Sequence, residues 1–242
     1  MPPRSKLQGW LLLVLLSLPV ASRAGTQVLL TGEWPPYTGI IEPEGGSMAA
    51  VVRAAYASQG DQVRLGFFGW FRIARLLATD KGFTASFPHY YSAERAARCH
   101  FSRPIGSSPL GLAARRGTSL QWTDVTDLQR YRIGTVRSYV SVPALDRLVA
   151  SRKVRTLTAL DDADNLRNLV AGKVDAIVVD RNVFAYLLRS DAFRDSATQL
   201  RLDPRVLVMH DLYMCFPRTP AGLAARDRFN AGLARLQEPA LR

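Results

Sequence analysis

The sequence predicts an α/β fold with two lobes, each built from a sheet and its helices. Strand-like and helix-like patterns alternate along almost the whole chain, and a segment rich in Pro, Gly and Ser separates two such runs. The second run echoes the first. The 242 residues, of which 48% are hydrophobic and 21% charged, are those of a globular protein with one large domain or two small ones.

Residues 1–24 predict a signal peptide. Arg4 and Lys6 precede the apolar stretch "GWLLLVLLSLPV" (9–20), which is shorter than the roughly 20 residues of a transmembrane helix. "SRA" then places small residues before Gly25, as a cleavage site requires. An uncleaved anchor is the alternative. Cleavage would release a soluble, exported protein.

The first half after the leader predicts a strand–helix–strand–helix–strand unit and therefore a parallel sheet. Ser47 is expected to cap the first helix, whose apolar residues recur at helical spacing until Gly60. The strands are expected at 27–34, 62–68 and 83–87, and the helices at 48–60 and 70–82.

A connector, "FSRPIGSSPLGLAARRG" (101–117), precedes the second run, which repeats the alternation. Residues 205–217 are compatible with one strand or two. The other strands are expected at 131–136, 154–159 and 174–179, and the helices at 141–151, 162–173, 181–190 and 222–237.

Both halves contain a short strand that leads to a polar helix start. Ser92 follows the strand at 83–87 after a short polar turn, and Asp180 follows "AIVV" directly. Ligands of open α/β sheets bind beyond the carboxyl ends of strands, so facing lobes would place both helix starts in one cleft.

Arg95 and Asp180 are the candidate charged groups. Capping alone would explain Ser92 and Asp180, since an N-cap stabilises a helix by about 1 kcal/mol. Arg95 would be the third helical residue, where a cation opposes the helix dipole, and this favours an anionic partner. Facing each other, Arg95 and Asp180 would hold the carboxylate and the ammonium of a zwitterion.

Aromatic residues gather at the same strand ends. Each of them, taken singly, is more often part of a core than of a site, but several beside Pro and Gly fit the walls of a pocket. They are Trp34, Tyr37, Trp70, Tyr90 and Tyr91.

The formal net charge is +12, of which Arg4, Lys6 and Arg23 of the leader carry three, so +9 remains. No Lys/Arg-rich run of five to eight residues exists, although 114–117 and 147–155 are locally dense, and export also argues against nucleic acid as a partner. Cys99 and Cys215 allow one disulfide in an oxidising compartment, but their spacing neither supports nor excludes it.

Common enzyme motifs are missing from the sequence. There is no G-x-S-x-G, no phosphate-binding loop, no dinucleotide-binding glycine motif, no H-E-x-x-H and no C-x-x-C. We therefore expect neither an enzyme nor a cofactor or metal. Lone carboxylates such as Glu33 and Asp180 have little specificity as catalytic signals.

Several motifs, in order, resemble the bacterial periplasmic solute-binding proteins of the polar amino-acid type (extracellular solute-binding family 3). "SAERAARCHFSRPI" is similar to that family's T-P-E-R segment with its downstream F-S-x-P, and "EWPPYTG" to its first loop. "DLQRYRIGTVRSYV" and "LVAGKVDAIVVDRNVFAYLL" resemble segments of its second half.

The resemblance implies a type II fold whose two lobes are joined by two crossing strands and close on a ligand. It assigns 25–107 and 211–242 to one lobe and 108–210 to the other. It also implies carboxylate binding by Arg95, with the loop of Ser138 and Tyr139, and ammonium binding by Asp180. The further ligand contacts that it implies are Trp34, Trp70, Pro88 and Tyr90.

Three residues depart from the family pattern. Ala93 replaces a proline, Thr84 an aspartate, and Ser138 a glycine, which puts the geometry of the carboxylate-binding loop in doubt.

The function implied is capture of a small zwitterionic or anionic solute, an amino acid or a related compound, by a monomer that delivers it to an ABC importer permease. Two alternatives stay open. One is a periplasmic enzyme like cyclohexadienyl dehydratase, with Asp180 or Glu33 transferring a proton. The other is a ligand-binding sensor or accessory protein.

Overall fold

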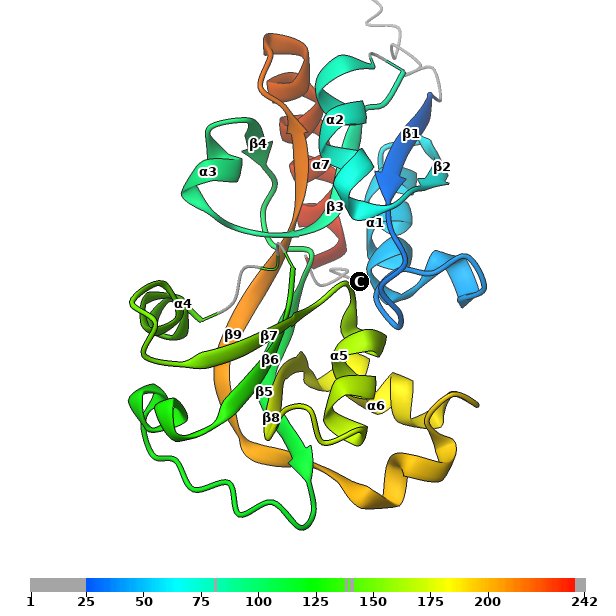
Figure 1. Ribbon diagram of the computed structural model, residues 1–242. Coiled ribbons are helices and arrows are strands. Elements are labelled where there is room, and N and C mark those ends of the chain that lie inside the picture. The colour runs from blue at the N-terminus through cyan, green and yellow to red at the C-terminus, as the bar shows by residue number, and fades with distance from the viewer. Residues whose placement is uncertain (1–24, 81, 138, 140–141, 238–242) are drawn as a thin grey trace, which may run out of the picture.

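Two lobes share one continuous sheet in the computed structural model, which describes residues 25–80, 82–137, 139 and 142–237 (Figure 1). The predicted signal peptide and Ser138 lie outside the described residues. The sheet has the order β2-β1-β3-β9-β5-β8-β6-β7, with β4 also paired to β9. No helix in the described part of the chain is long and apolar enough to cross a membrane.

Most of the predicted helices and strands are present, in the predicted order. The strands are β1 Thr26–Thr31, β2 Gln62–Phe67, β3 Ala85–Tyr90, β4 Cys99–Phe101, β5 Gly106–Arg115, β6 Arg132–Val136, β7 Arg155–Ala159, β8 Ala176–Asp180 and β9 Leu200–Pro217. The α-helices are α1 Ser47–Ala57, α2 Trp70–Thr79, α3 Ala93–Ala96, α4 Pro143–Ala150, α5 Asp162–Val170, α6 Arg181–Arg189 and α7 Pro220–Gln237. The short 3-10 helices, which we did not predict, are η1 Pro43–Gly45, η2 Val125–Arg130 and η3 Arg194–Gln199.

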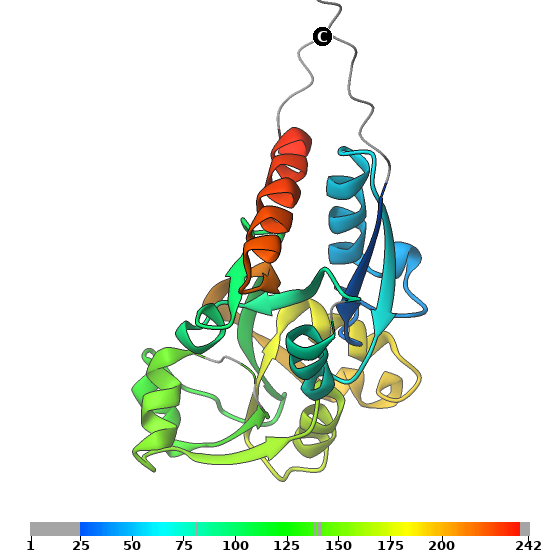
Figure 2. The same cartoon turned by 90° about the horizontal axis from the view of Figure 1, so that it is seen from above.

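The first lobe contains β1 to β4, α1 to α3 and α7. Strand β1 pairs in parallel with β2 and β3, as the βαβαβ pattern predicts. Helices α1 and α7 lie side by side (Figure 2), with the rings of Tyr56 and Phe229 5.2 Å apart. Gly232 permits this approach, because a Cβ there would lie 2.2 Å from the Ala55 carbonyl oxygen.

The second lobe contains β6 to β8 and α4 to α6. Strand β6 pairs in parallel with β7 and β8. Strand β8 is buried along its whole length, which explains the unbroken apolar run before Asp180. The lobe has two apolar clusters, one around Leu128 and Leu145 and one around Leu166 and Leu169.

The connector expected at 101–117, in which Pro, Gly and Ser stand among β-compatible residues, is mostly strand β5. Its residues pair antiparallel with β8 on one side and β9 on the other. Pro, Gly and Ser interrupt the strand pattern, but the inner part of the strand, "LGLAA" (110–114), is buried. Strand β9 extends from the second lobe into the first, where it pairs with β3 and β4, so two strands cross between the lobes. Both predicted lobe boundaries fall inside these two strands.

The predicted Ser47 cap is also wrong. Gly46 is the N-cap of α1, and both the hydroxyl and the backbone N–H of Ser47 donate to the Pro36 carbonyl. The chain needs glycine before the helix because φ is +107° there and a Cβ would lie 2.5 Å from the Tyr37 carbonyl oxygen.

Cys99 and Cys215, whose pairing the sequence left open, form a disulfide between β4 and β9, with a Cα–Cα distance of 5.3 Å. The bond closes a long loop that contains the second lobe.

We expect Cys99→Ala/Cys215→Ala to lower the free energy of unfolding by roughly 2–5 kcal/mol. Urea unfolding with and without reductant would measure this, and reductant should leave the double variant unchanged. Equal unfolding of variant and parent in oxidising buffer would contradict it.

Candidate functional site

Asp180 ends β8 and caps α6, as predicted, and its side chain is buried. Its Oδ1 accepts the backbone N–H groups of Asn182 (2.7 Å) and Val183 (2.9 Å). Its Oδ2 accepts the hydroxyls of Tyr37 (2.8 Å) and Ser108 (2.5 Å). The carboxylate therefore accepts four hydrogen bonds, which come from both lobes and from a crossing strand.

Asp162 is a second buried carboxylate, which the sequence analysis missed. It is the first residue of α5, with 7% of its surface exposed. Its Oδ2 accepts the Trp34 Nε1–H (3.2 Å) and the Tyr139 hydroxyl (2.9 Å), and its Oδ1 accepts no hydrogen bond from any described residue. One signal existed: "DDAD" starts this helix with two consecutive acids, and Asp161 alone supplies the cap.

Burial raises the pKa of Asp162 to about 6. The hydrogen bonds from Tyr139 and Trp34 oppose this shift, while the charges of Asp180 and Asp161 add to it. No cation among these groups compensates the carboxylate.

Aromatic rings surround the two carboxylates. The Trp34 ring lies 4.5 Å from that of Tyr37, 5.8 Å from that of Tyr90 and 6.4 Å from that of Tyr139. The Tyr90 hydroxyl is 2.6 Å from Ser108 Oγ, which links it to Asp180. Burial raises the pKa of all three tyrosines above the ordinary value, so their hydroxyls stay neutral.

A cavity of about 110 Å³ lies among these side chains, which come from both lobes. Its described lining contains three carboxylates and no basic side chain. It is formed by Trp34, Tyr90, Leu110, Thr135, Val136, Tyr139, Leu145, Asp146, Val149, Asp162, Val178, Val179 and Asp180. We take this cavity as the candidate site.

The loop after β1 holds the two lobes together at this cavity. Besides its contact with Asp180, the Tyr37 hydroxyl accepts Asn182 Nδ2 at 2.8 Å. The Tyr186 hydroxyl of α6 donates to Glu42 at 2.8 Å, and Val183 of α6 packs into the core of the first lobe. Together with the hydrogen bond from Trp34 to Asp162, these contacts hold the two lobes in a closed arrangement.

Arg95 lies beside the cavity rather than on its wall. Ser92 caps the four-residue helix α3 as predicted, accepting the Arg95 backbone N–H at 3.2 Å, and Arg95 Nη1 donates to the Tyr90 carbonyl at 3.0 Å. Burial lowers the pKa of Arg95, and burial followed by the charge of Arg95 lowers the pKa of His89 to about 3, so His89 is neutral. A helix of one turn has little dipole, which weakens the argument that Arg95 opposes it.

The cavity thus gathers four of the predicted ligand contacts, Trp34, Tyr90, Tyr139 and Asp180. Trp70 and Pro88 do not line it. Trp70 Nε1 donates to the Glu33 carbonyl at 3.2 Å, with the indole 6.2 Å from the His89 ring, and Pro88 is buried after a cis peptide bond. The predicted ligand contacts of all these residues stay predictions.

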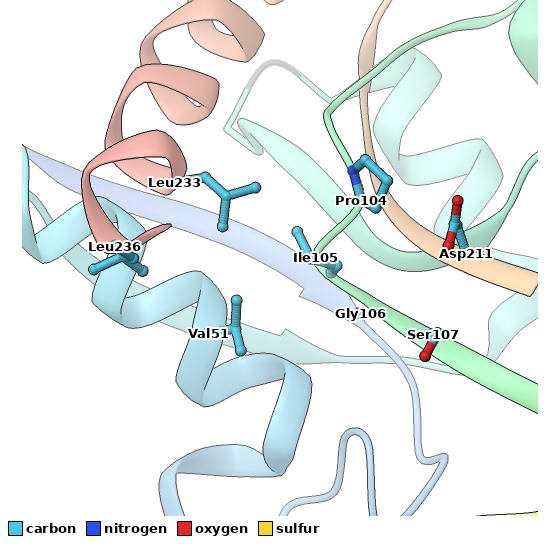
Figure 3. A pocket seen from close by; sticks show the side chains of 8 residues that line it. All are labelled: Val51, Pro104, Ile105, Gly106, Ser107, Asp211, Leu233 and Leu236. Atoms are coloured by element: carbon cyan, nitrogen blue, oxygen red, sulfur yellow. The ribbon is translucent and has the colours of Figure 1, made fainter. Parts of the chain in front are cut away.

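A larger hollow of about 440 Å³ lies beside α1, α7 and the start of β5 (Figure 3). Its described lining carries one carboxylate, that of Asp211, and none of the predicted site residues. The lining residues are Val51, Pro104, Ile105, Gly106, Ser107, Asp211, Leu233 and Leu236. Its largely apolar wall offers little to orient a polar ligand, so we prefer the interlobe cavity.

Metal binding has no support in the described residues, where no group of three or more His, Cys, Asp or Glu side chains could hold an ion. Asp162 and Asp180 are separately anchored by hydroxyl and N–H donors.

The chain is similar in structure to two-lobed periplasmic-binding-protein-like domains. A histidine kinase sensor domain with similarity to periplasmic binding proteins matches with a TM-score of 0.72 and 23% identity, over 87% of this chain and 90% of that one. An ancestral arginine-binding protein bound to arginine matches with a TM-score of 0.72 and 16% identity, over 88% and 92%.

An ancestral amino acid-binding protein, described as a precursor of cyclohexadienyl dehydratase, matches with a TM-score of 0.69 and 18% identity, over 88% and 89%. No protein-family model and no curated protein matches the sequence. These likenesses confirm the predicted two-lobed fold class.

The charge of Asp162 should destabilise the folded protein at neutral pH. The pKa of Asp162 is about 6 in the folded protein and roughly 3.9 for an exposed aspartate, so protonation favours the folded state. This stabilising contribution is fully present below about pH 4 and is lost as the pH rises through 6. Without added ligand at pH 8, the free energy of unfolding of Asp162→Asn, measured by urea unfolding, should therefore exceed that of the parent by up to roughly 3 kcal/mol. At pH 4 the two proteins should differ little.

The matched control is Asp161→Asn, which changes the same charge one residue away at an exposed position and retains a good capping residue. It should show no comparable difference between the two pH values. Destabilisation by Asp162→Asn at pH 8 would contradict the prediction.

Proposed function

We propose that the chain captures a small zwitterionic or anionic solute, an amino acid or a related compound, between its lobes in the periplasm. It would act as a monomer and deliver the solute to the permease of an ABC importer, without covalent chemistry. The observation that carries the proposal is the interlobe cavity, where buried carboxylates of the second lobe meet aromatic rings from both lobes. The structural neighbours described as amino acid-binding or bound to arginine add support.

Asp180 would bind the α-ammonium of the ligand, which would replace the Tyr37 hydroxyl as a hydrogen-bond donor to the carboxylate. The Tyr37 hydroxyl already lies 3.3 Å from the Ser107 carbonyl oxygen, so it has an alternative acceptor if an ammonium takes its place. The exchange would replace a neutral donor with a charged one, which strengthens the bond.

Arg95 would hold the carboxylate after a change of partner. Its guanidinium now donates to a backbone carbonyl, and its partial burial lowers the free-energy cost of pairing it with an anion. His89 beside it is neutral and offers the anion no competing charge.

Titration calorimetry with a panel of amino acids tests the binding proposal. At least one should bind, and Arg95→Ala should weaken binding roughly 10- to 100-fold, because a charge-assisted hydrogen bond is lost. Arg98→Ala is the matched control, since Arg98 is exposed, pairs with Glu94 on the surface and should bind as the parent does. Absence of binding by every amino acid and small carboxylate, or unchanged affinity in Arg95→Ala, would contradict the proposal.

One observation favours a second candidate function, proton transfer as in a cyclohexadienyl-dehydratase-like enzyme. A buried carboxyl with a pKa of about 6 in a cleft suits a general acid or base near neutral pH, and Asp162 has both properties. Asp180 is fully hydrogen-bonded, and Glu33 accepts the Ile40 N–H at an exposed position, so neither is favoured for this role.

Turnover of prephenate or arogenate, abolished by Asp162→Asn, would establish the enzymatic alternative. Ligand binding without turnover would favour the binding protein. Uptake of the identified ligand by cells with and without the chain would then separate delivery to an importer from sensing.

A further inference from the structure

We infer that Asp162 recognises a second cationic group on the ligand, so that the solute is a cationic amino acid or a related compound with an amine or guanidinium side chain. This inference rests on the proposed function, which leaves the side chain of the solute open. Asp180 would take the α-ammonium and Asp162 the side-chain cation.

The carboxylate of Asp162 is held in position, but only one of its two oxygens accepts hydrogen bonds from the described residues. Trp34 from the first lobe and Tyr139 from the second both donate to Oδ2, which sets the orientation of the group. Oδ1 accepts nothing from the described residues, although the residue is more than nine-tenths buried and lines the cavity. An oxygen with open lone pairs on the wall of a cavity can accept a hydrogen bond from a donor group of the ligand.

The charges around the cavity indicate which kind of donor it is. The described lining holds Asp146, Asp162 and Asp180 and no Lys, Arg or His, in a protein whose net charge is +12. Asp146 is exposed on α4 and screened by water, but Asp162 is buried with only neutral donors. A buried anion without a counter-charge is unfavourable, and a ligand cation would supply that charge.

The rings beside Asp162 also suit an organic cation. Trp34, Tyr90 and Tyr139 all line the cavity, and their faces attract ammonium and guanidinium groups. A bare metal ion would need several oxygen or nitrogen ligands around one point, and the described residues form no such group.

The size of the cavity fits the end of a side chain. Its volume of about 110 Å³ is room for a charged group and adjoining methylenes, but not for a whole amino acid. The remainder of the ligand would extend towards Arg95 as the contacts of Tyr37 rearrange, while the hydrogen bond from Trp34 to Asp162 stays in place.

Binding measurements with isosteric ligand pairs test the inference. Arginine is compared with citrulline and lysine with norleucine, by calorimetry at pH 7.5 on the full mature chain, in the parent, Asp162→Asn and Asp161→Asn. In the parent and in Asp161→Asn, the cationic member of a pair should bind about 10-fold or more tightly than its neutral isostere. In Asp162→Asn this ratio should fall to within about threefold, through weaker binding of the cationic member.

Each outcome decides between the two proposals. If neutral or acidic amino acids bind the parent as tightly as cationic ones, or if Asp162→Asn keeps the parent's preference, the role of Asp162 is overturned while amino-acid binding stands. If no amino acid binds the parent, the proposed function and this inference both fail. If Asp162→Asn does not fold, the parent's preference within each isosteric pair still tests the inference alone.

Discussion

The burial of the Asp180 carboxylate is the constraint on which the arrangement of the two lobes depends. This group ends a strand, begins a helix, accepts a hydroxyl from the crossing strand β5 and accepts another from the loop after β1. Hydrogen bonds to both oxygens offset the free-energy cost of burying this carboxylate, so the second lobe, the hinge and the first lobe meet at one point. The aromatic rings of the site follow from this, because Tyr37 and Tyr90 reach the carboxylate directly or through Ser108.

The second carboxylate shows that stability alone did not shape the cavity. Asp180 is satisfied by four donors, whereas Asp162, in the same cavity, has two donors on one oxygen and none from the described residues on the other. A core selected only for stability would replace such a charge with an amide or an apolar group. An uncompensated buried charge is typical of functional sites, where a ligand supplies what the protein lacks.

Most of the fold could be predicted from the sequence, and the site only in part. The helices and parallel strands have clear periodicity, and Asp180 and Ser92 were recognisable as caps because each is a capping residue that follows a predicted strand and precedes a helix pattern. Strand β5 was predicted only as a connector because Pro, Gly and Ser interrupt its β-compatible residues. The cap of α1 was misplaced at Ser47 because the conformation of Gly46 decides where the helix begins. Asp162 was missed because its burial results from contacts with Trp34 and Tyr139, and Trp34 lies 128 residues away. No local pattern encodes such a contact.

Trp34 couples recognition to closure. Its indole N–H from the first lobe donates to the Asp162 carboxylate of the second, so the carboxylate proposed to bind a ligand cation also holds the lobes together. A cation on the open Oδ1 would leave this bond in place and strengthen it, because an ionised carboxylate is the better acceptor and the cation keeps it ionised. A neutral side chain in the same space would bring no counter-charge. Closure would then bury the ionised Asp162 without a cation to offset the free-energy cost of its desolvation. The closed form should therefore be favoured most by a cationic ligand, which makes the selectivity of the site and its closure consequences of one hydrogen-bonded carboxylate.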